Sequence, residues 1–192
     1  MSTFCSIRHR LIFVHVPKCA GTTINIAILR AINGGKPSPE FRLIGQGSHP
    51  FAKVVRELVG KKSWANCWKF GVVRNPWERM VSLYAFLRER ELIESDVTFR
   101  SWLLDGSNAH KKAVPQSYWL CDDGRQIVNT VFRFERLDSV RSALSAHLGQ
   151  PIRLGRYRKT AHGDYRGYYD GDMEAWVGEV HAEDIERFGY EF

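Results

Sequence analysis

One lysine of this chain lies where a strand is expected to turn into a helix. The turn and the start of the helix consist of Pro17, Lys18, Cys19, Ala20, Gly21, Thr22 and Thr23. At a helix start the backbone N–H groups have no helical partner, and the peptide dipoles give that end partial positive charge. An anion placed there is held by several donors at once, and Gly21 lets the backbone approach it closely. Because Lys18 adds a full positive charge, the segment is typical of a phosphate-binding site.

The flanking sequence predicts both elements. Residues 11–16 are almost uniformly apolar, as in a parallel strand that is buried on both faces. Pro17 ends the strand, because it has no N–H to give to a neighbouring strand. Apolar residues then recur at helical spacing from Ile24 until two glycines, Gly34 and Gly35, end the helix.

Arg74 lies in a second turn of the same kind. An apolar strand over residues 70–73 precedes it, Asn75 is a good helix cap, and Pro76 suits the first helical position. The planar guanidinium of Arg74 is suited to the oxygens of a phosphate. Ser82 lies on another face of the helix than the apolar stripe and can donate a further hydrogen bond. Two anion sites at the carboxyl ends of two strands indicate one ligand with two separated phosphate-like groups.

The first loop does not have the spacing of the nucleoside triphosphatase loop, in which the lysine follows the second of two glycines. Here Lys18 precedes Gly21, and an apolar strand that ends in an aspartate suited to magnesium is not evident. A nucleotide-dependent small-molecule kinase is therefore kept only as an alternative function.

Together these segments resemble the sulfotransferases that use 3′-phosphoadenosine-5′-phosphosulfate (PAPS), in particular the carbohydrate sulfotransferase branch and its small bacterial members. Residues 17–23 resemble the family's 5′-phosphosulfate loop and residues 73–82 its 3′-phosphate motif, and residues 132–137 and 184–192 are similar to further family segments. The resemblance implies an α/β fold, a three-layer sandwich around a central, mostly parallel sheet with a P-loop-like phosphate site. It also implies PAPS as co-substrate, 3′-phosphoadenosine-5′-phosphate (PAP) as product, and a hydroxylated small molecule or glycan as acceptor.

The resemblance gives Lys18 the role of neutralising charge on the oxygen that bridges sulfur and the 5′-phosphate. Because a sulfuryl group carries less charge than a phosphoryl group, a lysine and backbone donors suffice there without a metal ion. Arg74 and Ser82 are expected to bind the 3′-phosphate. A loop over residues 156–166 closes over the nucleotide in similar enzymes, and its candidate residues are Lys159, Thr160 and Arg166. A solvated basic stretch is the alternative for this segment.

A general base must take the proton from the acceptor hydroxyl, and histidine is suited to this near neutral pH. Our candidate is His49, which precedes an expected helix over residues 51–59 and corresponds to a histidine in similar bacterial enzymes. Glu57 is the reserve, since some branches use a glutamate in this region. The alternative for His49 is a capping or packing role at the helix start. For His15, placed in the first strand, a hydrogen-bonded core position is expected.

Each principal candidate has a structural alternative. Lys18 is otherwise a surface lysine, Arg74 an ion-pair partner, and Ser82 a solvent-facing serine. Cys19, inside the anion loop, is conceivable as a catalytic thiol with a lowered pKa. The four cysteines are widely spaced, which indicates neither a disulfide framework nor a zinc site.

Composition sets further bounds. The 192 residues fit one domain, residues 1–192, with a substantial core. The net charge of +7 favours a polyanionic ligand, so a non-catalytic module that binds acidic glycan or nucleic acid is a third possibility. An apolar stretch long enough to span a membrane is not evident, and we expect a cytoplasmic protein that does not act on nucleic acid. The acceptor and the oligomeric state are not determined by the sequence.

The remaining elements follow from periodicity and from turn residues. Helices are expected from Pro76 to about residue 91 and over residues 98–104, 139–148 and 173–187, a strand over residues 127–134, and loops over residues 34–47 and 105–114.

Overall fold

The computed structural model describes residues 3–35, 42–44, 49–106, 110, 112–155 and 163–192. The chain divides into two compact units. Unit 1 combines Met1–Val73 with Ser117–Arg158, and unit 2 combines Arg74–Gln116 with Lys159–Phe192. The expectation of one domain over residues 1–192 stays a prediction.

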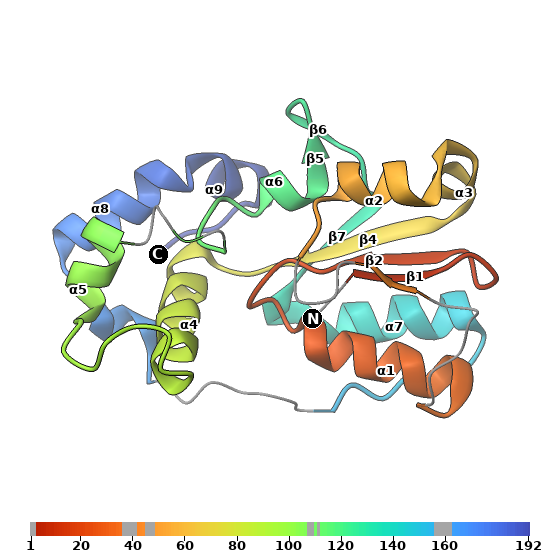
Figure 1. The fold of residues 1–192 in the computed structure, drawn as a ribbon, viewed down its shortest axis with the longest axis horizontal. Coiled ribbons are helices and arrows are strands. Elements are labelled where there is room, and N and C mark those ends of the chain that lie inside the picture. The colour runs from red at the N-terminus through yellow and green to blue at the C-terminus, as the bar shows by residue number, and fades with distance from the viewer. Residues whose placement is uncertain (1–2, 36–41, 45–48, 107–109, 111, 156–162) are drawn as a thin grey trace. The chain divides into compact units, whose positions relative to one another are not determined.

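Unit 1 is built, within the described residues, on a five-stranded sheet in the order β3-β1-β2-β4-β7 (Figure 1). Its strands are β1 (Thr3–Ser6), β2 (Leu11–Val14), β3 (Arg42–Ile44), β4 (Trp68–Val73) and β7 (Thr130–Arg133). The strands β2, β4 and β7 pair in parallel, whereas β1 pairs antiparallel with both β2 and β3. The α/β class is confirmed, and the sheet is mixed.

The antiparallel edge has a local cause. A tight turn joins β1 directly to β2, with the Arg10 N–H donating to the Ile7 carbonyl at 3.0 Å. So short a connection permits only antiparallel pairing, because parallel neighbours need a crossover of a dozen or more residues. The strand β3 lies inside the expected loop over residues 34–47, and we therefore correct that prediction.

The parallel pairs bring three strand ends to one edge of the sheet. Phe13 of β2 lies opposite Phe70 of β4, with ring centroids 4.8 Å apart, and Val14 lies opposite Gly71. Val73, the last residue of β4, lies opposite Arg133 of β7. The segments that follow β2 and β4 therefore leave the sheet at the same edge.

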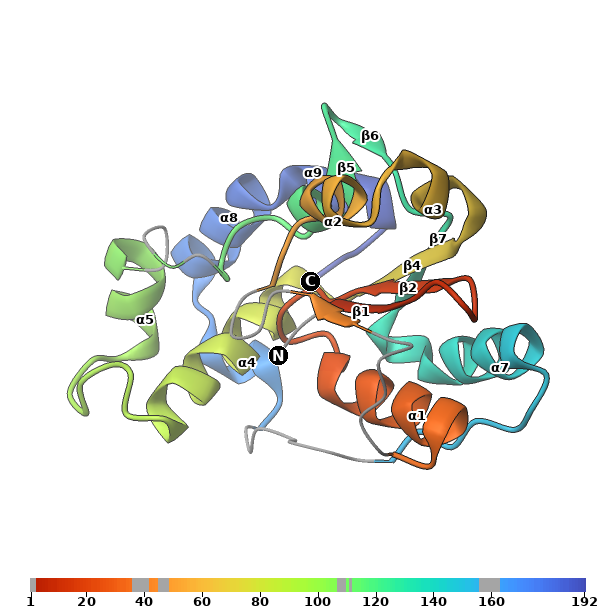
Figure 2. The same ribbon diagram turned by 45° about the vertical axis from the view of Figure 1, so that its right-hand side comes forward.

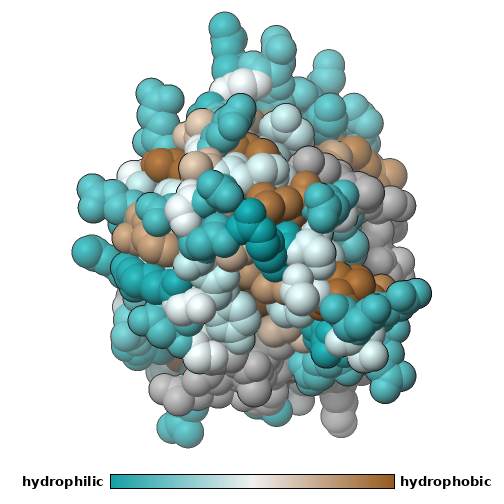
Figure 3. All heavy atoms as spheres, turned by 90° about the vertical axis from the view of Figure 1, so that its left-hand side faces the viewer, coloured by the Kyte–Doolittle hydropathy of each residue, from teal (hydrophilic) through white to brown (hydrophobic). Residues whose placement is uncertain are grey.

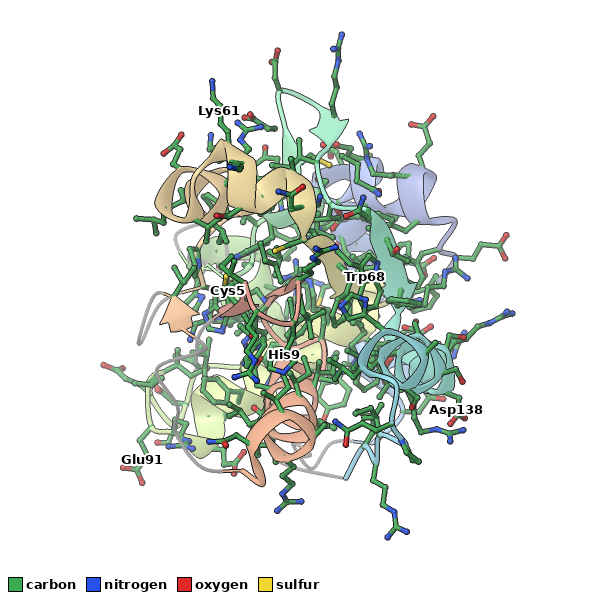
Figure 4. All side chains as sticks on the ribbon, turned by 90° about the vertical axis from the view of Figure 1, so that its right-hand side faces the viewer. Cys5, His9, Lys61, Trp68, Glu91 and Asp138 are labelled. Carbon is green, nitrogen blue, oxygen red and sulfur yellow. The ribbon has the colours of Figure 1, made fainter. Side chains whose placement is uncertain are left out.

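Helices cover both faces of this sheet. On one face lie α1 (Gly21–Asn33) and α7 (Leu137–Leu148), side by side in Figures 1 and 2, and the Gln150 amide donates to the Ala31 carbonyl at 2.9 Å. On the other face lie α2 (Ala52–Val59) and α3 (Lys61–Asn66). Figure 4 shows Lys61 of α3 and Asp138 of α7 on opposite outer sides of the sheet. The three-layer arrangement of unit 1 agrees with the expected sandwich.

Shorter elements complete unit 1. The helix α6 (Ser117–Leu120) precedes a hairpin of β5 (Cys121–Asp122) and β6 (Arg125–Gln126). An ion pair of 2.6 Å between Arg56 and Asp122 joins α2 to this hairpin. Leu120 packs so closely on β4 that a Cβ at Gly71 would lie 2.4 Å from its Cδ2 atom. Glycine in the middle of β4 is thus required by the packing of α6.

Unit 2 is helical in its described part. Its elements are α4 (Pro76–Glu89), α5 (Phe99–Ser101), η1 (Trp102–Gly106), η4 (Tyr165–Tyr168), α8 (Gly171–Val180) and α9 (Ala182–Phe188). The expected apolar stripe of α4 packs in a core with Phe99, Trp102 and Val177. The face drawn in Figure 3 is mainly hydrophilic, with small and separated hydrophobic patches. Among the described helices, none is both long and apolar enough to cross a membrane.

The expected single helix over residues 173–187 is wrong, because the chain breaks at His181. There the backbone leaves helical values, with φ −109° and ψ 22°. His181 and Asp184 are both fully buried. The pattern hides the break, since the buried residues Met173, Val177, His181 and Asp184 keep helical spacing across it.

Candidate active site

The loop between β2 and α1 has an unusual backbone. Lys18 has a φ of 67° and Ala20 a φ of 59°, both in the left-handed region that L-residues adopt at a cost. Residues that alternate between left- and right-handed conformations turn successive N–H groups toward one concave side, which is typical of anion-binding loops. The first helical hydrogen bond of α1 runs from the Ile24 N–H to the Ala20 carbonyl at 3.1 Å. The N–H groups before Ile24 therefore precede the first hydrogen bond of the helix and lie at the positive end of its dipole.

The side chains of this loop differ in exposure. Lys18 is half-buried, and Pro17, Cys19, Gly21 and Thr23 are buried, whereas Ala20 and Thr22 are partly exposed. The Cys19 thiol donates to the Pro17 carbonyl at 3.4 Å and is completely buried. Such a position suits packing, because reactive cysteines are partly exposed. Its use as a nucleophile is not supported.

His15 explains why a glycine begins α1. The strand β2 ends at Val14, so His15 lies one residue beyond it, with 4% of its surface exposed. A Cβ atom at Gly21 would lie only 1.8 Å from Nε2 of His15. The glycine therefore makes room for an imidazole ring, which sequence analysis did not foresee. The expected core position of His15 is found, with its ring stacked on Phe13 at 5.9 Å.

His49 lies beside His15. The two rings meet edge to face with centroids 4.6 Å apart, and His49 is partly exposed. Its carbonyl accepts a hydrogen bond from Nε1 of Trp119 at 3.1 Å. Phe51, two residues after His49, is the N-cap of α2. Glu57 lies on the exposed side of α2, whereas His49 is linked to the start of α1 through His15.

Arg74 begins unit 2, directly before the N-terminus of α4. Asn75 caps that helix, since its Oδ1 accepts from the Glu78 N–H at 3.2 Å, and Pro76 occupies the first turn as expected. The Arg74 guanidinium forms an ion pair of 2.7 Å with Glu78, and its side chain is 8% exposed. The ion-pair alternative is thus present in the structure, although the guanidinium has further donors.

Ser82 is not solvent-facing, because only 2% of its surface is exposed. It lies one helical turn beyond Glu78, on the face of α4 that Arg74 contacts. The alternative of a solvent-facing serine is therefore wrong.

The remaining nucleotide-binding candidates are only partly described. Lys159 and Thr160 lie outside the described residues. Arg166 lies in η4, where its guanidinium carbon is 4.7 Å from the ring centroid of Tyr165 and 5.8 Å from that of Phe192. In the described part of the chain, His, Cys, Asp and Glu residues do not form groups of three or more that could hold a metal ion.

Unit 2 contains a buried polar network that has no counterpart among the predictions from the sequence. Arg79, which is fully buried, donates to the carbonyls of Lys112, Ala113 and Val114 at 2.8, 3.2 and 2.8 Å. Gln116, His181 and Asp184 are fully buried as well. Burial lowers the pKa of His181 below its ordinary value, which favours the neutral imidazole beside Asp184. The one signal in the sequence was the similarity of residues 184–192 to a family segment.

A family model described as the sulfotransferase family matches residues 1–190. The chain belongs to the sulfotransferase family. The resemblance found in the sequence is therefore confirmed over nearly the whole length of this sulfotransferase, including both units.

One solved structure shows the same fold. The sulfotransferase is similar to mouse sulfotransferase SULT7A1 complexed with PAP, with 16% identity and a TM-score of 0.59 over 94% of this chain and 85% of that chain. It is also similar to a sulfotransferase from Alicyclobacillus acidocaldarius, with 17% identity and a TM-score of 0.48 over 91% of this chain and 92% of that chain. No curated protein matches the sequence significantly.

The contact between His15 and Gly21 gives a stability prediction. We expect Gly21→Ala to destabilise the sulfotransferase by about 2 kcal/mol, because the new methyl group overlaps the His15 ring. The matched control is Gly178→Ala in α8, where the Cβ would make an ordinary 3.9 Å contact with Trp77. That change should stabilise by about 0.5–1 kcal/mol, because alanine favours a helix. Urea unfolding measures both.

A second variant tests the cause. Adding His15→Ala to Gly21→Ala removes the overlapping ring, so the cost of the alanine at position 21 should largely disappear. An equal cost of Gly21→Ala with and without the His15 ring would contradict the explanation.

Proposed function

We propose that this sulfotransferase transfers a sulfuryl group from PAPS to a hydroxyl group of a carbohydrate or a small glycosylated metabolite. The observation that carries the proposal is the loop from β2 to α1, in which the left-handed residues Lys18 and Ala20 lead into the positive end of a helix. Such a loop suits the 5′ end of a nucleotide. Family membership and the PAP complex of the mouse relative support PAPS as donor and PAP as product.

The 5′ end of the donor would be bound by residues 17–23. Their backbone N–H groups would hold the 5′-phosphate and the transferring group, and Thr22 and Thr23 offer hydroxyl groups. In the transfer, a bond forms between the acceptor oxygen and sulfur while the bond from sulfur to the bridging oxygen breaks. The Lys18 ammonium would neutralise the charge that develops on the bridging oxygen of the departing PAP. Because a sulfuryl group carries less charge than a phosphoryl group, this step proceeds without a metal ion in our proposal.

The 3′-phosphate would be bound by Arg74 and Ser82. Support comes from the place of Arg74 directly before the N-terminus of α4, where the helix dipole favours an anion, and from Ser82, which lies one helical turn beyond its partner Glu78. The guanidinium pairs with Glu78, and because a guanidinium carries several N–H donors, that ion pair does not by itself exclude a phosphate. Lys159, Thr160 and Arg166 remain proposed contacts of the nucleotide from the segment over residues 156–166.

The acceptor hydroxyl would lose its proton to His49. This histidine is partly exposed, lies outside α2, and is linked through His15 to the loop that would hold the donor. A neutral imidazole can accept a proton near neutral pH, as a general base requires. Glu57, on the exposed side of α2, is the reserve. A cytoplasmic location is part of the proposal as well.

A titration with PAP separates this proposal from the two alternatives. Calorimetry of the full chain should give micromolar binding of PAP in buffer with a chelator, and about the same affinity with added Mg²⁺. Binding of ATP that requires Mg²⁺ would favour a kinase instead. Absence of nucleotide binding, together with salt-sensitive binding of a polyanion, would favour the polyanion-binding module.

The role of Lys18 predicts a large catalytic effect. We expect Lys18→Ala to lower kcat by about 10²–10³-fold, since a charge placed to stabilise the leaving oxygen is lost. The control is Lys53→Ala, which removes an exposed lysine of α2 and should leave kcat unchanged. Transfer of labelled sulfate to an acceptor found by screening hydroxylated sugars measures both. Near-normal turnover of Lys18→Ala would remove this residue from the mechanism.

The role of His49 predicts a different pattern. His49→Ala should lower kcat by about 10²-fold and leave the Kd for PAP within about twofold, because a base acts on the acceptor and not on the donor. Glu57→Gln is the companion variant and should retain activity. The reverse result, with Glu57→Gln inactive and His49→Ala active, would assign the base to Glu57. A large loss of PAP affinity in His49→Ala would mean that His49 has another role.

A further inference from the structure

The side chain of Gln116 holds the main chain of Arg74. Its Oε1 accepts from the Arg74 N–H at 2.8 Å, and its Nε2 donates to the Arg74 carbonyl at 2.8 Å. Gln116 is fully buried. One primary amide thus satisfies both polar main-chain groups of a single residue, as a neighbouring strand would do.

Asp184 in turn fixes the amide of Gln116. Its Oδ2 accepts from the Gln116 main-chain N–H at 2.6 Å and from Nε2 at 3.3 Å. With the amide turned around, Oε1 of Gln116 would face a buried carboxylate, which is repulsive. The carboxylate therefore selects the one orientation in which Gln116 can hold Arg74. Hydrogen bonds to an ionised, buried acceptor are also stronger than neutral ones.

The surroundings of this contact are restrained on both sides. Arg79 binds the carbonyls of Lys112, Ala113 and Val114, which fixes the segment that leads to Gln116. The Asn75 amide donates to the Glu191 carbonyl at 2.8 Å. Arg74 and Asn75 are consequently held both by the segment before Gln116 and by the C-terminal segment. A helix start needs a cap, which Asn75 already provides, so capping alone does not require this network.

We propose that Gln116 and Asp184 are positioning residues, which fix the main chain of Arg74 so that its guanidinium is directed at the 3′-phosphate of the nucleotide. The inference rests on the proposed function, in which Arg74 binds that phosphate. An arginine side chain is long, so a small rotation of its main chain displaces the guanidinium far enough to break a two-point contact. The network prevents that rotation.

The test compares two nucleotides that differ only in the 3′-phosphate, PAP and adenosine 5′-monophosphate. In the full chain, Gln116→Met keeps an unbranched side chain of similar length and removes both hydrogen bonds to Arg74. We expect its affinity for PAP to fall by about tenfold while its affinity for adenosine 5′-monophosphate stays within about twofold. Calorimetry measures both, and circular dichroism verifies the fold. A purely structural role would weaken both nucleotides alike and leave their affinity ratio unchanged, which would overturn the proposal.

Four further proteins make the result decisive. Gln126→Met is the matched control, because Gln126 donates to the Val128 carbonyl in the β6 region and should leave the ratio unchanged. Asp184→Asn keeps the shape of the native side chain, and we expect it too to lower the affinity for PAP relative to that for adenosine 5′-monophosphate. If Gln116→Met does not fold, Asp184→Asn takes its place in the test. Adding Gln116→Met to Arg74→Met should not lower the preference for PAP over adenosine 5′-monophosphate any further. An additional, independent loss of this preference would overturn the positioning role.

The same data separate the two proposals. If the wild-type protein does not prefer PAP, or if Arg74→Met retains the preference, the proposed 3′-phosphate site is wrong. If Arg74→Met loses the preference and both Gln116→Met and Asp184→Asn keep it, only the positioning role is wrong.

Discussion

The parallel pairing of β2 with β4 is the constraint on which the rest of the candidate site depends. It brings Val14 and Val73 to one edge of the sheet, so both strands end where a proposed anion-binding segment begins. The pairing is held by stacked rings of Phe13 and Phe70 and by a glycine at position 71, which admits Leu120 against β4. A register shift by one residue would turn each of these side chains to the opposite face. The chemistry at the strand ends is therefore fixed by apolar contacts in the middle of the strands.

Features with a local cause could be predicted from the sequence. The helix α1 ends where the two glycines follow it, with Gly34 in the left-handed conformation and donating to the Arg30 carbonyl at 3.0 Å. Asn75 caps α4, and Pro76 occupies its first turn. In each case one or two residues determine the backbone, so a single sequence suffices. The strand, loop and helix around Lys18 belong to this class.

Features that depend on distant residues could not be predicted in the same way. The strand β3 has three residues, too few to show an alternating pattern, and it owes its existence to pairing with β1. Gly21 was correctly placed at the helix start, but its neighbour His15 is a tertiary contact. Gln116 and Asp184 are far apart in sequence, and neither has neighbours that mark it as buried. Burial of polar residues is the information that periodicity does not carry.

The two proposed anion-binding segments obtain their rigidity from different sources. Around Lys18 it is steric: left-handed residues, each costing on the order of 1 kcal/mol, are held between a proline and a glycine packed against His15. Around Arg74 it is polar: buried amide, carboxylate and guanidinium groups saturate the main chain with hydrogen bonds. A steric constraint tolerates a change of charge but not a change of volume. A buried polar network also tolerates changes of volume poorly, and it tolerates the loss of a hydrogen-bond donor or acceptor even less. The loop can therefore vary in its partly exposed side chains, as Ala20 and Thr22 are placed to do, while the surroundings of Arg74 must keep their polar groups for the guanidinium to retain one direction.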